Sequence, residues 1–192
     1  MEFTLIKSKR KTVALQIAQD GTLIVRAPKS YTQAQAKAFV DKNKDWISKH
    51  LPKIEQKHAA MSKISDKEAL LAKKCLEALT LILIKKYAKV LNTYPESIKI
   101  TSAKKRFGSC STNKHLCFSY FLCFYPFDAI EYVVVHELCH IFHPNHSKAF
   151  HALTERTLFN AKKKEKLLKA ENFSIENLYA NCEILKNLSV DN

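Results

Sequence analysis

Five of the eight histidines in this chain lie between positions 133 and 151, in the stretch VVVHELCHIFHPNHSKAFH. In a helix, His136 and His140 stand one turn apart on the same side, so their imidazoles can bind one cation. Glu137 lies about 100° further round the helix, beside such a cation rather than beneath it. Two histidines on one face with this glutamate between them are the pattern of a zinc hydrolase, in which the glutamate is the general base.

A catalytic zinc ion needs a third protein ligand and an open position for water. His143 would follow on the same face of an unbroken helix, but Pro144 disfavours the α-conformation in the residue before it. The helix should therefore end there, and the turn can bring His146 back toward the metal. His146 is ten positions after His136, which is the ligand spacing of the extended zincin motif. We predict one Zn²⁺ ion held by His136, His140 and His146, with His143 at the rim of the site.

The N-terminal part of the chain predicts a small lobe of strands and a helix. Residues 2–27 contain two β-rich runs joined at Asp20-Gly21, a strong hairpin signal. Residues 30–52 read as a helix with apolar residues at helical spacing, and Pro52 is predicted to mark its end. Residues 53–65 are the best candidate for a linker.

The following part predicts the elements that position the histidines. Ser65 and Glu68 form a capping box that opens a long helix. Short strands are expected next, and then the helix that carries the motif, with Asp128 as its N-cap and Glu131 in capping-box position. The remaining expected elements are strands at 97–103, 106–111 and 115–124, a helix after His146, and a last helix at about 174–188.

Composition and charge limit the functional classes. The chain is 46% hydrophobic and 26% charged, and its 2 glycines argue against Gly-rich phosphate loops. It has no apolar run long enough for a membrane span, no signal-peptide order and no C-x-x-C pair, so we expect a cytoplasmic protein with reduced thiols. Residues 1–125 carry 24 basic and 9 acidic side chains. This excess is a solvated surface or a surface for nucleic acid or nucleotide phosphates.

Three segments in order resemble the YgjP-like metallopeptidase domain, a group similar to the SprT-like and WLM zincins. They are RFGSCS at 106–111, a strand ending in Tyr-Pro, and AIEYVVVHELCHIFHPNHSKAFH at 129–151. The N-terminal hairpin also fits, so the resemblance reaches about residue 160. Phe107 stands where tryptophan is usual, and His151 stands where a second aromatic is usual, which leaves the shape of the pocket open.

The resemblance implies an α+β fold with a small zincin-like (minigluzincin-like) catalytic domain. Its active-site helix would lie beside a short mixed or antiparallel sheet, next to an N-terminal lobe of β-hairpin and helix. The expected domains are 1–60 for the lobe, 61–170 for the metallopeptidase domain and 171–192 for a C-terminal helical appendage. The resemblance also implies that strand 115–124 runs beside the active-site helix, as an edge strand that aligns an extended peptide.

We therefore expect a zinc metallopeptidase that cleaves a peptide or protein substrate. Zinc would activate water, and Glu137 would take its proton and return it to the leaving amine. Arg106, Tyr120 and His143 are candidates to contact the substrate. Three alternatives stay open: a metal-dependent UTP pyrophosphohydrolase, as some YgjP-like proteins are described; a DNA-associated protease like the SprT-like enzymes, binding DNA through residues 1–125; and a metal-stabilised binding module without turnover.

Overall fold

Buried apolar side chains form two separate clusters, which belong to two units of the chain. A computed structural model of the chain describes residues 1–18, 20–169 and 173–190. The first unit comprises Met1–Lys63 and the second Ile64–Asn192.

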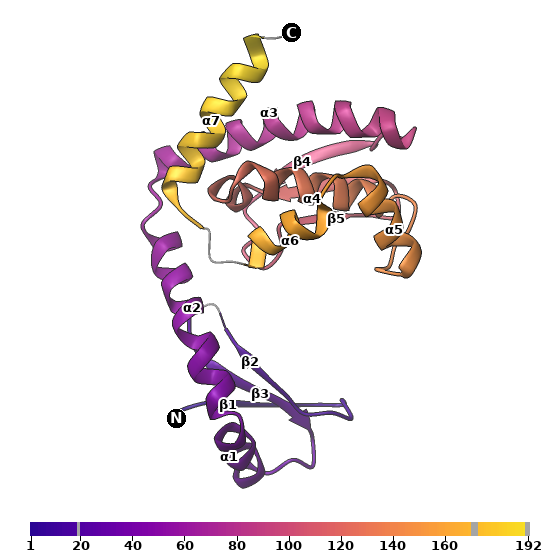
Figure 1. The fold of residues 1–192 in the computed structure, drawn as a ribbon. Coiled ribbons are helices and arrows are strands. Elements are labelled where there is room, and N and C mark those ends of the chain that lie inside the picture. Colours follow the sequence, from indigo (N-terminus) through magenta and orange to yellow (C-terminus); the bar gives the residue numbers. More distant parts are fainter. Residues whose placement is uncertain (19, 170–172, 191–192) are drawn as a thin grey trace. The chain divides into compact units, whose positions relative to one another are not determined.

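The first unit is a three-stranded sheet with two helices (Figure 1). The predicted hairpin is confirmed: β2 (Ala14–Ile17) and β3 (Leu23–Pro28) pair antiparallel, and Gly21 in the turn has a φ of 87° that favours glycine. A third strand, β1 (Thr4–Ser8), pairs parallel with β3 and gives the order β1-β3-β2. The core face of β3 carries Leu23, Val25 and Ala27, which are buried.

The predicted helix at 30–52 is present but interrupted and does not end at Pro52, and the predicted linker 53–65 is wrong. The helix is broken at Asn43 into α1 (Gln33–Lys42) and α2 (Lys44–Ser62), and α2 continues through Pro52. An interior proline removes one backbone hydrogen bond and costs about 3 kcal/mol. Packing outweighs this cost, because Leu51 and Ile54 on either side of the proline both pack against the core of the unit.

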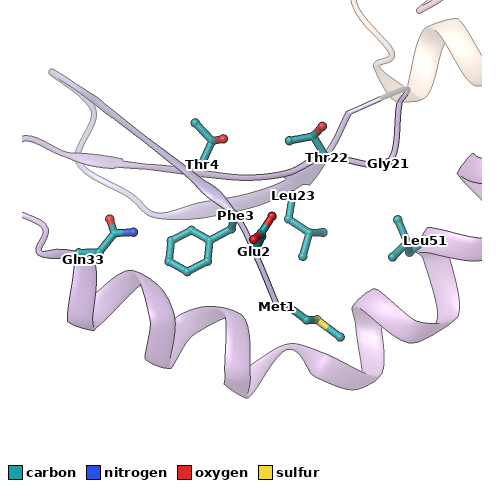
Figure 2. A pocket seen from close by; sticks show the side chains of 9 residues that line it. All are labelled: Met1, Glu2, Phe3, Thr4, Gly21, Thr22, Leu23, Gln33 and Leu51. Carbon is teal, nitrogen blue, oxygen red and sulfur yellow. The ribbon is translucent and has the colours of Figure 1, made fainter.

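A cavity of about 690 Å³ lies within the first unit (Figure 2). Figure 2 shows its wall of side chains from the start of β1, from the β2–β3 turn and from both helices. The lining residues are Met1, Glu2, Phe3, Thr4, Gly21, Thr22, Leu23, Gln33 and Leu51. The wall includes none of the histidines of residues 133–151, so the predicted chemistry must be sought in the second unit.

The second unit has a mixed three-stranded sheet surrounded by helices (Figure 1). Its first helix, α3 (Asp66–Leu91), has the predicted capping box: Glu68 N donates to Ser65 Oγ, and Ser65 N donates to Glu68 Oε2. Strands β4 (Ser97–Thr101), β5 (Gly108–Cys110) and β6 (His115–Ser119) have the order β4-β6-β5. β4 pairs parallel with β6, and β5 pairs antiparallel with it. The predicted α+β class is confirmed.

The remaining elements of the second unit are η1 (Tyr120–Phe124), α4 (Phe127–Cys139), α5 (Lys148–Thr157), α6 (Ala161–Lys169) and α7 (Ile175–Val190). The motif helix α4 contacts α3 on one side and α6 on another. Its three consecutive valines are all buried, which explains why a β-prone run folds as a helix. Packing on several sides, rather than local propensity, determines the conformation of this segment.

The predicted strand 115–124 ends earlier and is not an edge strand. β6 stops at Ser119, and the next residues form the 3₁₀ helix η1. The run of apolar residues in η1 has no polar alternation, and four of its five side chains are buried. Asn181 of α7 holds this turn, because its Nδ2 donates to the carbonyls of Cys123 and Tyr125 at 2.9 and 2.8 Å. β6 is the central strand, so β5 and β4 are the outer ones.

The predicted cap of the motif helix is also wrong. The N-cap of α4 is Pro126, without a side-chain hydrogen bond. Glu131 instead turns into the protein, where it accepts from Tyr87 at 2.5 Å and pairs with Lys86 and Lys164. A buried carboxylate is stable only with such partners, and here they tie α4 to α3 and α6. Glu131 therefore belongs to this buried network and does not cap the start of the helix.

The predicted C-terminal segment 171–192 contains α7, which lies within the second unit. Leu178 of this helix is fully buried in the core of the unit. Across the described residues, no helix is both long and apolar enough to cross a membrane.

Candidate metal centre

Three histidine side chains converge at the C-terminal end of α4. The Nε2 atoms of His136 and His140 are 3.1 Å apart, those of His140 and His146 are 3.1 Å apart, and those of His136 and His146 are 3.0 Å apart. Tetrahedral zinc with Zn–N bonds of about 2.0–2.1 Å needs its nitrogens roughly 3.3 Å apart. The three nitrogens thus lie within a few tenths of an ångström of the spacing that zinc requires.

The chain brings these histidines together by ending α4 and turning. α4 ends at Cys139, somewhat before the predicted end, but His140 keeps helical backbone angles and so stays one turn from His136. The turn that follows contains Pro144. His146 then precedes Ser147, whose Oγ accepts from Phe150 N and caps α5. The turn and the cap of α5 therefore place His146, which lies outside α4, beside the two histidines at its end.

His143 does not join the three converging side chains. Its backbone carbonyl lies 2.9 Å from Nδ1 of His140. A proton on that Nδ1 would donate to the carbonyl, which leaves Nε2 of His140 unprotonated and free to bind a metal. Because a backbone atom makes this contact, His143 can orient a ligand without using its own imidazole.

Two aromatic residues fix the other histidines. The hydroxyl of Tyr132 lies 3.3 Å from Nδ1 of His136, one turn earlier on α4. Phe150 of α5 is fully buried, and its ring centroid lies 4.8, 4.5 and 4.9 Å from those of His136, His140 and His146. One apolar ring thus contacts all three imidazoles and limits their rotation. Outer contacts of this kind tune the metal affinity of a site.

The electrostatics of the cluster favour a cation. Burial, together with the neighbouring histidines, lowers the pKa of His136 to about 4, and burial lowers the pKa of His140. Neutral imidazoles at pH 7 are the form that binds metals. Three imidazole nitrogens at this distance from one another suit a shared cation between them. Three histidine donors, of which His146 is exposed, fit a catalytic zinc ion.

Glu137 lies beside this cluster with its carboxylate against β5. The residue is 6% exposed. An ideal Cβ placed on Gly108 would lie only 2.5 Å from Glu137 Oε1, so the carboxylate rests directly on that glycine. Burial raises the pKa of Glu137 to about 7, against the opposing effect of the Arg106 guanidinium. A carboxyl group with this pKa can both accept and release a proton at neutral pH.

The raised pKa predicts a pH-dependent stability cost in the metal-free protein. The pKa of Glu137 is about 7 in the folded protein, against an ordinary value of 4.5. Its contribution to the free energy of unfolding is therefore fully present below pH 4.5 and is lost as the pH rises through 7. Glu137→Gln removes this titration. The free energy of unfolding of the variant, relative to that of wild type, should rise by roughly 2–3 kcal/mol from pH 5 to pH 8.

Urea unfolding of both metal-free proteins at these two pH values measures this gain. Glu77→Gln, at an exposed position of α3, controls for the loss of a charge in itself. An advantage of Glu137→Gln that is the same at both pH values would contradict the assigned burial of the carboxylate.

The three residues predicted to contact the substrate differ in how close they lie to the metal centre. Arg106 is exposed, and its charge acts on Glu137, so the structure brings it near the predicted base. Tyr120 contacts other parts of the unit: its ring stacks on Phe121 at 4.2 Å and lies 5.5 Å from Nζ of Lys73 on α3. His143 stays at the rim through the turn described above.

Sequence reasoning missed three residues of the centre. Tyr132 precedes His136 by four positions on α4, so helical spacing offered a signal for it. Phe150 had no such signal, because His146 lies before the N-cap of α5. Gly108 had no such signal, because its contact with Glu137 joins a strand and a helix that are distant in sequence.

A model of the YgjP-like metallopeptidase domain family matches residues 11–73 and 62–171. A search of curated proteins finds no match. Among solved structures, the chain is similar to the metallopeptidase zymogen of Pyrococcus abyssi abylysin, with a TM-score of 0.42 and 18% identity. That similarity covers 46% of this chain and 90% of the other.

Proposed function

This chain belongs to the YgjP-like metallopeptidase domain family, and on that premise we propose that it is a zinc-dependent peptidase. Its single zinc ion would be held by His136, His140 and His146. The observation that carries the proposal is the convergence of their three Nε2 atoms at 3.0–3.1 Å, with one buried carboxylate beside them.

Zinc, Glu137 and the groups that orient the histidines would have separate roles in the reaction. When bound, zinc would supply a Lewis acid that polarises the substrate carbonyl and lowers the pKa of a bound water from 15.7 toward about 7. Glu137 would take the proton from the attacking water and return it to the leaving amine. Tyr132 and the carbonyl of His143 would hold the rings of His136 and His140 in their binding orientation.

The outer strand next to α4 is the proposed place for an extended substrate. β5 pairs with β6 on one side, and among the described strands it has no partner on the other. Gly108 of β5 touches Glu137, so a peptide added beside this strand would pass the proposed base. Backbone hydrogen bonds to a free strand edge are a common mode of peptide recognition. Arg106, two residues before Gly108, is proposed to face the substrate.

The donor set favours a peptidase over a pyrophosphohydrolase. Magnesium, the usual partner of triphosphates, binds through carboxylates and phosphate oxygens. The converging donors are instead three imidazoles, which suit zinc. The carboxylate of Glu137 is not among these converging donors, and we propose it as the base.

A paired substrate screen tests the proposal. Zinc-loaded protein and chelator-treated protein are incubated with a peptide library and, separately, with UTP. We expect peptide cleavage that disappears with the chelator and returns with zinc, and no release of pyrophosphate from UTP. Pyrophosphate release without peptide cleavage would overturn the peptidase assignment. Peptide cleavage that continues with the chelator would overturn the requirement for a bound metal.

A further inference from the structure

We propose that Gly108 is a positioning residue of the hydrolytic centre, because the absence of a side chain lets the Glu137 carboxylate lie against the backbone of β5. The role rests on the proposed function, since it takes Glu137 as the base, whereas the contact itself needs no activity. An ideal Cβ at position 108 would lie 2.5, 2.7 and 2.8 Å from Oε1, Cγ and Cδ of Glu137. Real Cβ atoms essentially never approach other atoms within 3.0 Å.

The requirement concerns space and not backbone conformation. Of the two glycines, Gly21 has a positive φ and Gly108 does not, so alanine could adopt the backbone angles of Gly108. Cys110, two residues on, lies on the same face of β5. Burial, followed by the charge of Glu137, raises the pKa of the Cys110 thiol, which agrees with this face lying toward the carboxylate.

β5 cannot retreat from an added methyl group. Gly108 pairs with Phe118 of β6, which is fully buried, and Ser119 N donates to the carbonyl of Phe107 at 2.8 Å. β6 is held on its other side by β4. A shift of β5 would therefore break the pairing of a central strand and disturb the core.

The backbone of Glu137 is equally fixed. Its neighbours on α4, Val134 and Leu138, are fully buried, and His136 belongs to the converging histidines. The element that can yield is the Glu137 side chain, which must rotate its carboxylate away. A displacement of about 1 Å in a catalytic group can cost on the order of 10²-fold in rate.

A double-mutant cycle on the metal-free protein tests the contact without any substrate. Wild type, Gly108→Ala, Glu137→Ala and the double variant are unfolded by heat. Overpacking a core contact in a chain of this size lowers the Tm by a few degrees. We expect Gly108→Ala to lower the Tm by about that much when Glu137 is present, and to leave it unchanged in the Glu137→Ala background.

Kinetics of the cobalt-substituted enzyme test the positioning. The visible absorption of bound Co²⁺ reports the metal ligands, so it should be the same in wild type and Gly108→Ala. We expect kcat per bound cobalt to fall by about 10²-fold with little change in KM. Cys117→Ala, on the opposite face of the sheet, is the matched control and should keep the kcat of wild type.

The outcomes separate this inference from the proposed function. Equal Tm shifts in the two backgrounds overturn the contact, and an unchanged kcat overturns its role in positioning. If Gly108→Ala does not fold alone but folds together with Glu137→Ala, the contact is supported. If no variant and no wild type cleaves peptides, the proposed function fails, while the thermal cycle still decides whether Gly108 makes room for Glu137.

Discussion

Glu137→Gln is expected to lower kcat for peptide hydrolysis on the order of 10²–10⁴-fold while zinc stays bound. Glutamine has nearly the shape of glutamate and can keep the contact with Gly108, but it cannot accept a proton from water. Zinc should be retained, because Glu137 is not among the three residues whose nitrogens converge. Steady-state kinetics and zinc competition with a chromophoric chelator measure the two effects separately.

Glu77→Gln, at an exposed position of α3, serves as the control for this prediction and should match wild type in both measurements. A Glu137→Gln protein that keeps more than about a tenth of the wild-type kcat would remove Glu137 from the role of general base. Loss of zinc from this variant would place the carboxylate among the metal ligands instead.

His146→Ala is expected to weaken zinc binding by roughly 10²–10³-fold. Apparent binding energies of about 10–16 kcal/mol for four-ligand zinc sites correspond to roughly 3 kcal/mol for each ligand. His143→Ala, three residues earlier, should leave zinc affinity nearly unchanged, because the carbonyl that faces His140 Nδ1 belongs to the backbone and survives the substitution. Calorimetric zinc titration of the two variants beside wild type measures the difference.

The His143→Ala and His146→Ala variants also test the turn after α4. If His143→Ala loses zinc and His146→Ala keeps it, the ring of His143 is the third ligand and the turn differs from the one described. Equal and small losses in both variants would mean that the two helical histidines bind the metal without a third imidazole.

The local features of the metal centre could be predicted because they depend on short-range rules. Helical phase placed His136 and His140 on one side, and Pro144 indicated the turn that brings His146 to them. The same kind of rule predicted the Asp20-Gly21 hairpin and the box at the start of α3. In each case the determining atoms lie within about one turn of each other in the sequence.

The features that were predicted wrongly depend on contacts between distant segments. Pro52 should have ended a helix by local rules, but the core on both sides of it keeps α2 intact. Glu131 had the spacing of a capping residue and was drawn into the protein by partners on α3 and α6. The family resemblance implied an outer position for the strand at 115–124, but β6 lies in the middle because it pairs with both β4 and β5.

The metal centre likewise combines features set by short-range rules with features set by contacts between distant segments. The identity of the converging histidines follows from their spacing, whereas the position of the Glu137 carboxylate follows from β5. No pattern within α4 indicates that a glycine from a separate strand must lie beneath this carboxylate. The raised pKa of Glu137 was equally out of reach, because it depends on burial by the whole unit.

We propose that these three histidines and Glu137 form one hydrolytic centre for peptide bonds. Digestion of a peptide library in ¹⁸O-labelled water, followed by mass spectrometry, tests it most directly when zinc per chain is measured in each sample. With wild type we predict new carboxyl termini carrying ¹⁸O in proportion to bound zinc. With zinc-loaded Glu137→Gln we predict at most about a hundredth as many. Equal cleavage by the two proteins, or no cleavage by fully loaded wild type, would contradict the claim.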